Sequence, residues 1–279
     1  DLEKWTSCSE IRHVLETKDH VTICVESKER TWEFMIYPVV GGFRMVAGKK
    51  GFFDGKPEAF SMEESEHAYI IRSKEHEMIL QKETLEISID RKAITNLKNI
   101  SFIFEKESVS ASRIQFSIHE NSAIYGFGER FDSVNQYGKT VALWQRDACE
   151  GCLASIGNQA YKNIPLVHTS DGFSFFANTS YRMRMDVGDA VQDYLSVEAL
   201  GDVFDFYIWS GTPREAMTAY GTLTGLPIFP PEWVFEPWAG GGGGRWRNGP
   251  LQDIALEQMA AMKKFHELDI PHSGFYAEG

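Results

Sequence analysis

The sequence has few cysteines, no excess of cations and no long apolar run. Four cysteines among 279 residues are too few for a disulfide scaffold, and they favour a reducing compartment such as the cytoplasm. A net charge of −12 argues against a nucleic-acid-binding protein, because neutralising phosphates requires clustered Lys and Arg. No apolar stretch approaches the ~20 residues that span a bilayer, so we expect no membrane partner.

Two of the cysteines, Cys149 and Cys152, form a Cys-x-x-Cys motif. A structural zinc ion would need two further ligands, and the sequence contains no second Cys-x-x-Cys and no His-x3-His. A redox pair of the thioredoxin type follows a strand and opens a helix, a context that "DACEGCLAS" lacks. We therefore predict two ordinary thiols, with no metal ion and no cofactor.

Apolar residues make up 43% of the chain, which is enough for a large core. Many of them lie in short runs of alternating apolar and polar residues, rich in Val, Ile, Phe and Tyr. Such runs, separated by polar or Gly-containing turns, are typical of antiparallel sheets packed as a sandwich. The runs span residues 20–39, 68–74, 78–90, 100–106, 172–180, 182–188, 194–200 and 203–211.

The periodicity changes after residue 211. Residues 212–225 predict a helix, with Thr212 as its N-cap, Pro213 in its first turn and Gly225 at its end. The proline-rich stretch "LPIFPPEW" follows. We place a domain boundary there, between a β-sandwich domain over 1–227 and a second domain over 228–279.

Beyond the boundary the pattern is strand, helix, strand. We expect a strand in "WVFEPWA", a helix over 250–268 with one apolar stripe, and a strand in "IPHSGFYAEG". A strand, a helix and the next strand at this spacing belong in a parallel sheet or barrel. A single unit of this kind cannot cover its own faces, so we expect the natural protein to continue.

Five blocks of the sequence resemble, in order, the motifs of glycoside hydrolase family 31, the retaining α-glycosidases. The resemblance spans about 125–279, and "WQRD" and "QAYKNIP" are closest to the α-xylosidase-like branch, with α-glucosidases as further relatives. Gln145 stands where the family usually has Asn. The blocks are "IYGFGERF", "NQYGKTVALWQRDA", "QAYKNIP", "IWSGTPREAMTAYGTLTGLPIFPPEW" and "IPHSGFYAEG".

The resemblance implies an N-terminal β-sandwich followed by a (β/α)8 TIM barrel, of which this chain would hold only the first two strands. It also implies hydrolysis that releases a terminal non-reducing α-linked sugar, with retention through a covalent glycosyl-enzyme intermediate. Retention requires two carboxylates about 5–5.5 Å apart. The family carries both on later barrel strands, so we expect no catalytic residue in this chain and no activity from it alone.

Two carboxylates are candidates for substrate binding. The resemblance implies that Asp147 lies on a sandwich loop at the barrel mouth, where a carboxylate can accept hydrogen bonds from adjacent sugar hydroxyls. Glu278 matches the acid at the end of the family's second barrel strand, although the family usually has Asp there. The alternative for both residues is a solvated side chain in a turn or at a strand end.

The glycine run from Gly240 to Gly244 has three possible interpretations. A phosphate-binding loop is excluded, because "RWRNGP" follows the run in place of Gly-Lys-Ser/Thr. A flexible linker stays possible. We favour a loop after the first barrel strand, with Trp238, Arg245 and Trp246 at its edges as substrate-binding residues, although Trp238 could equally be a core residue.

Two other classes of function stay open. The same architecture could carry out transglycosylation or α-glucan elimination, because the access of water decides between hydrolysis and transfer. The chain could also be a non-catalytic, carbohydrate-binding β-sandwich. In each case the expected partner is an oligosaccharide or α-glycoside, and a homo-oligomer is compatible with the sequence.

Overall fold

The computed structural model describes the chain except for residues 1–4, 28–29, 107, 146–159, 242–250 and 278–279. The chain divides into two compact units, Asp1–Gly225 and Leu226–Gly279. The described part of the first unit consists of two large antiparallel sheets and one helix.

One sheet of the first unit has ten strands in its described residues. β10 pairs with β9 through its first residues and with β11 mainly through its last ones, and register shifts interrupt both pairings. Such shifts bend a strand, which lets β10 join the two halves of the sheet. In spatial order the strands are β13 (Lys139–Leu143), β16 (Met183–Val187), β17 (Tyr194–Leu200), β11 (Ser108–Ser117), β10 (Lys92–Glu105), β9 (Glu86–Ile89), β8 (Glu77–Gln81), β7 (Ala68–Arg72) and β6 (Ser61–Glu64), with β1 (Thr6–Ser7) beside β10.

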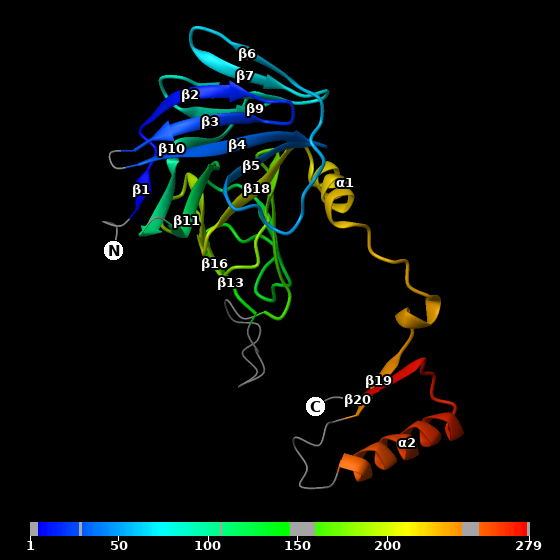
Figure 1. The fold of residues 1–279 in the computed structure, drawn as a ribbon. Coiled ribbons are helices and arrows are strands. Elements are labelled where there is room, and N and C mark those ends of the chain that lie inside the picture. The colour runs from blue at the N-terminus through cyan, green and yellow to red at the C-terminus, as the bar shows by residue number, and fades with distance from the viewer. Residues whose placement is uncertain (1–4, 28–29, 107, 146–159, 242–250, 278–279) are drawn as a thin grey trace. The chain divides into compact units, whose positions relative to one another are not determined.

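The other sheet has eight strands and faces the first (Figure 1). In spatial order they are β12 (Ile124–Gly128), β14 (Asn163–Thr169), β15 (Phe173–Ala177), β18 (Val203–Ser210), β5 (Gly42–Gly48), β4 (Thr31–Val39), β3 (Val21–Glu26) and β2 (Glu10–Glu16). Each alternating run of the sequence contains a strand of one of the two sheets, and the predicted antiparallel β-sandwich is confirmed.

The core lies between the two sheets and is rich in phenylalanine. Phe116 of β11 stacks on Phe175 of β15 with ring centroids 4.3 Å apart. Phe102 of β10 meets Phe204 of β18 edge to face at 5.4 Å. Each pair joins one sheet to the other, and all four side chains are buried. Because burying one such side chain is worth ~1.5–3 kcal/mol, these contacts hold the two sheets together.

The helix α1 (Pro213–Thr224) contacts β14, β15 and β18 of the eight-stranded sheet. Its first turn is closed by a capping box, in which Thr212 Oγ1 accepts from the Glu215 N–H and the Glu215 carboxylate accepts from the Thr212 N–H. Gly225, at φ 89°, terminates the helix. The helix predicted over 212–225 is confirmed, because its cap, proline and glycine are all local signals.

The second unit contains a 3-10 helix η2 (Glu232–Phe235), β19 (Trp238–Gly241), α2 (Leu251–Glu267) and β20 (Gly274–Ala277). β19 and β20 pair in parallel, with Trp238 opposite Gly274. The strand predicted in "WVFEPWA" is wrong in its first half, because a 3-10 turn occupies it. Pro237 has no N–H to donate to a ladder, and the strand begins at the next residue.

Neither α1 nor α2 combines the length and the apolar composition of a membrane-crossing helix, judged on the part of the chain that is described. Two cysteines of the first unit, Cys8 and Cys24, are free and buried. Burial raises the pKa of Cys8 to about 12 and raises that of Cys24, so both thiols are unreactive at neutral pH. Cys149 and Cys152 lie outside the described residues.

Candidate functional site

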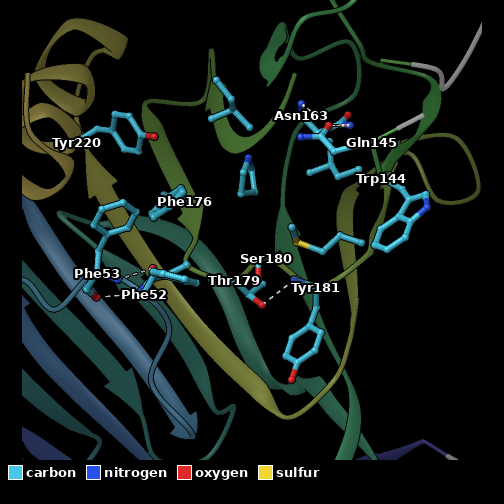
Figure 2. A pocket seen from close by; sticks show the side chains of 15 residues that line it. Phe52, Phe53, Trp144, Gln145, Asn163, Phe176, Thr179, Ser180, Tyr181 and Tyr220 are labelled. Carbon is cyan, nitrogen blue, oxygen red and sulfur yellow. Dashed lines mark hydrogen bonds between the residues drawn. The ribbon is translucent and has the colours of Figure 1, made fainter. Parts of the chain in front are cut away.

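A pocket of about 430 Å³ opens on the first unit beside the end of β13 and the start of β14 (Figure 2). These two strands flank residues 146–159 in the sequence. The volume of the pocket lies in the range of small-molecule sites. The residues that line it are Phe52, Phe53, Leu143, Trp144, Gln145, Asn163, Ile164, Pro165, Phe176, Asn178, Thr179, Ser180, Tyr181, Met183 and Tyr220.

Three aromatic side chains on the wall of the pocket are strongly exposed. Phe52 is 84% exposed, Trp144 54% and Tyr181 43%. Trp144 directly follows β13, and Tyr181 lies between β15 and β16, where its hydroxyl donates to Asp202 at 3.1 Å. Exposed aromatic faces that surround one cavity form a surface for a ring-shaped ligand or for other protein.

The backbone that carries Phe52 and Phe53 is held by a buried polar network. Asn178 accepts from the Phe53 N–H at 3.0 Å and donates to the Phe53 carbonyl at 2.7 Å and to Asp205 at 2.9 Å. Asp205 also accepts from Arg44 Nε at 2.9 Å and Nη2 at 2.6 Å. Burial alone would lower the pKa of Arg44, but the hydrogen bonds and charge of Asp205 raise it above its usual range. This network therefore fixes the backbone segment that carries Phe52 and Phe53.

Gln145 and Asn163 line the pocket away from Phe52 and Phe53, and Arg130 contacts Asn163. Asn163 Nδ2 donates to Gln145 Oε1 at 2.7 Å, and Asn163 Oδ1 accepts from Arg130 Nη2 at 2.6 Å. Burial lowers the pKa of Arg130, an effect that the charge of Asp132 opposes. The Nε and Nη1 atoms of Arg130 are buried and have no acceptor among the described residues.

The chemistry of the lining residues limits what the pocket can do. They provide amides, hydroxyls, an indole and aromatic faces, but no carboxyl, imidazole or thiol group. Across the described residues, no group of three or more His, Cys, Asp or Glu is placed to share a metal ion. The pocket as described can bind a ligand, but it has no side chain that could act as a general acid or base near neutral pH.

Residues 20–186 match the glycosyl hydrolase 31 N-terminal galactose mutarotase-like domain. The chain belongs to glycoside hydrolase family 31. The matched range contains both strands that flank the pocket, together with Arg130, Gln145 and Asn163. Among curated relatives, the α-xylosidase XylQ of Lactiplantibacillus pentosus is 34% identical over 131 residues, which are 47% of this chain and 16% of that protein.

Solved structures have the same fold. The cycloalternan-forming enzyme from Listeria monocytogenes, in complex with a pentasaccharide substrate, matches 98% of this chain and 27% of its own, with a TM-score of 0.81 and 18% identity. The α-1,4-glucan lyase of Gracilariopsis lemaneiformis matches 98% of this chain and 36% of its own, with a TM-score of 0.74 and 13% identity. At this identity the likeness establishes the fold alone. The chain spans a minor part of each of these proteins.

Only one of the five residues predicted to bind substrate is described. Trp238 begins β19 with 42% of its surface exposed; its Nε1 donates to the Val234 carbonyl at 3.2 Å and its ring lies 5.5 Å from that of Trp233. The Nε1 edge of Trp238 is thus hydrogen-bonded within its own unit, while part of the ring is exposed to solvent. The other four residues, Asp147, Arg245, Trp246 and Glu278, lie outside the described residues.

The structure adds residues that we did not predict from the sequence. Arg130, Trp144 and Asn163 all belong to blocks shared with family 31, so their position in those blocks was a usable signal. Phe52 had no such signal, because it lies outside any alternating run. Its place at the pocket depends on a network in which Arg44 bonds Asp205 and Phe53 bonds Asn178, and each of these two pairs is more than 100 positions apart in the sequence.

Proposed function

We propose that the whole protein to which this chain belongs is a retaining α-glycosidase, which releases a terminal non-reducing α-linked sugar through a covalent glycosyl-enzyme intermediate. The family match over residues 20–186 carries this proposal, and the name of the relative XylQ favours an α-xyloside or a similar α-glycoside as substrate. The two carboxylates that retention requires would be supplied by barrel segments outside this chain. No cofactor or metal ion takes part in this scheme.

The second unit is, in our proposal, the start of the (β/α)8 barrel, and the domain boundary divides 1–227 from 228–279. The parallel pairing of β19 and β20, with α2 between them in sequence, supports this view, since repeated units of this kind build such barrels. Functional side chains of these barrels follow the carboxyl ends of the strands. Glu278 directly follows β20 in the sequence.

The proposed binding roles follow from side-chain chemistry. Asp147 and Glu278 would each accept hydrogen bonds from hydroxyls of the sugar at the reacting position. Trp238 or Trp246 would offer a flat wall for the sugar ring, with Arg245 at the edge of the same site. In this arrangement the present chain contributes substrate binding, and later barrel segments contribute the chemical step.

Replacing Asp147 with Ala in the full-length enzyme tests the proposal. A hydrogen bond to a charged acceptor is worth ~1.5–3 kcal/mol, and a tenfold loss of kcat/KM corresponds to ~1.4 kcal/mol. We expect at least a tenfold loss on an aryl α-glycoside, with an unchanged circular dichroism spectrum. Asp193→Ala, a change at an exposed aspartate in the turn between β16 and β17, is the matched control. Unchanged kcat/KM for Asp147→Ala would contradict the role of this residue.

Product analysis distinguishes hydrolysis from the alternatives. A retaining hydrolase gives a free sugar whose anomeric configuration equals that of the substrate, as seen by proton NMR immediately after mixing. A transglycosylase instead gives longer oligosaccharides, and a lyase gives an unsaturated sugar. A non-catalytic carbohydrate-binding protein gives no product. Aryl α-xyloside and aryl α-glucoside, compared side by side, identify the preferred sugar.

A further inference from the structure

The pocket beside β13 and β14 has an uncharged lining. The fifteen described residues that line it include no Asp, Glu, Lys, Arg or His, although the chain carries a net charge of −12. An ionic ligand would find no counter-charge among these side chains, and burying an unpaired charge is costly. The ligand that fits this pocket is therefore neutral.

The exposed aromatic rings of the pocket are held in place. The buried network described above fixes the segment of Phe52, and Tyr181 has contacts of its own. The Tyr181 hydroxyl donates to Asp202 at 3.1 Å, and a Cβ on Gly201 would lie 2.5 Å from atoms of the Tyr181 ring. Asp202 also forms an ion pair with Lys49, three residues before Phe52. Rings fixed in advance lose little conformational entropy when a ligand binds, which favours recognition.

Two hydroxyl groups at the pocket are available to a ligand. Among the described residues, neither the Tyr220 hydroxyl nor the Ser180 hydroxyl makes a hydrogen bond. The Tyr220 ring packs edge to face on Phe176 at 5.2 Å, and its hydroxyl points away from α1 (Figure 2). A hydroxyl both donates and accepts. A purely apolar ligand would leave these two groups without partners, whereas a ligand with hydroxyls of its own would satisfy them.

We propose that this pocket of the first unit binds a neutral saccharide, whose sugar rings stack on Phe52 and Trp144 and whose hydroxyls bond to Ser180 and Tyr220. A sugar ring has apolar C–H faces and a rim of hydroxyls, which match exposed aromatic faces and uncharged polar groups. Phe52 is 84% exposed and Trp144 54%, so both faces are open to a ligand. The choice of an α-glycoside among saccharides rests on the function proposed above.

The test measures binding to the 279-residue chain, which lacks both catalytic carboxylates of the proposed mechanism. Saturation-transfer NMR titrations with methyl α-xyloside and with maltose give the Kd of each saccharide. Xylitol is the matched control ligand, because it is an acyclic polyol with hydroxyls but no ring face. We expect saturable binding of both saccharides and at least about fivefold weaker binding of xylitol, which cannot stack on an aromatic ring.

Variants of the chain then locate the bound saccharide. Phe52→Ala and Trp144→Ala should each raise Kd about fivefold or more, with little change in Tm because both side chains are exposed. Tyr220→Phe removes only a hydroxyl and should raise Kd about threefold. Phe131→Ala and Tyr125→Phe are the matched controls: these side chains are 50% and 37% exposed, lie outside the lining and should leave Kd unchanged.

Several results would overturn this binding site. They are the absence of saturable saccharide binding, equal affinity for xylitol, and an unchanged Kd in either Phe52→Ala or Trp144→Ala. A concentration-dependent dimer that Phe52→Ala abolishes would also overturn it, because a second copy of the chain would then cover the aromatic rings. The proposed function fails by a different result, namely unchanged kcat/KM of the full-length enzyme in Asp147→Ala.

Discussion

At the scale of single residues, Arg44 is the buried cation of the network that holds the backbone at Phe52 and Phe53. Its side chain is 1% exposed and that of Asp205 is 0% exposed, so both charged groups are shielded from solvent. The guanidinium donates two hydrogen bonds to Asp205 and one to Asp54, and Asp205 also accepts from the Gly51 N–H at 2.7 Å. A buried pair with so many partners is stable only while every partner is present.

We therefore expect Asp205→Asn to be severely destabilising. The change leaves Arg44 buried with only the mostly exposed Asp54 as its counter-charge, and breaking such a buried pair costs ~3–5 kcal/mol. The matched control is Asp202→Asn, which removes the charge from an exposed ion pair with Lys49 and should cost far less than the loss of the buried pair. Urea unfolding of both variants measures the difference. Similar midpoints for the two variants would show that the buried pair contributes little.

Asp132 provides a prediction about acid stability. Partial burial alone would raise its pKa, but hydrogen bonds from Lys139, Gln136 and the Ser133 N–H lower the pKa from 3.8 to about 2. A carboxyl with a lowered folded-state pKa stabilises the fold above its unfolded pKa, and this contribution is lost as pH falls toward the folded value. The Tm advantage of the natural protein over Asp132→Asn should therefore be nearly complete above about pH 5 and largely lost at about pH 2.

Thermal unfolding of both proteins between pH 2 and pH 7 checks this expectation. Asp193→Asn, whose side chain makes no ion pair within the described residues, should show no such convergence. An Asp132→Asn variant whose Tm deficit persists unchanged at pH 2 would show that the deficit has a cause other than the charge of Asp132.

At the scale of elements, local signals predicted α1 well and β12 poorly. The capping box of α1 lies within four residues, so the sequence contains all of it. β12 has positive φ angles at Gly126, Phe127 and Gly128, which alternation of apolar residues does not reveal. Its Gly126 lies so close to β14 that a Cβ there would meet the Leu166 carbonyl oxygen at 2.2 Å. Contacts of this kind join distant parts of the chain, and a periodic pattern cannot predict them.

The segment that carries Phe52 depends on a similar close approach at Gly51. A Cβ on Gly51 would lie 1.6 Å from the Asn178 carbonyl oxygen, and that oxygen belongs to the backbone. Gly51→Ala should therefore force the segment away from Asn178 and cost about 3 kcal/mol, the upper end for overpacking. Gly138→Ala has open space around the new methyl group and should cost only ~1–2 kcal/mol from its positive φ. Equal Tm losses in the two variants would contradict this account.

At the scale of the whole molecule, the two units differ in how much apolar surface they bury. In the first, two sheets enclose a core in which Phe116, Phe175 and Phe204 are almost completely buried. In the second, the described side chains are largely exposed: Ile228 is 91% exposed and Phe229 is 93% exposed. The sequence predicted both patterns of elements, since alternation indicates a sandwich and strand–helix–strand indicates a parallel unit. The sequence could not show which strands are hydrogen-bonded neighbours within each sheet, because that order depends on long-range contacts.

This difference predicts how the two units behave when they are produced separately. Residues 1–225 have a closed core and should unfold in urea in one cooperative transition. The described part of residues 226–279 has a two-stranded sheet, one 3-10 helix and one long helix, and a two-stranded sheet is at best marginally stable in water. We expect this fragment to show no cooperative transition, as followed by circular dichroism, because its described residues leave Phe229 and Leu256 largely exposed, Leu256 to 64%. A sharp transition in the 226–279 fragment would show that the parallel unit is an independent domain, and it would count against its being the first part of a barrel.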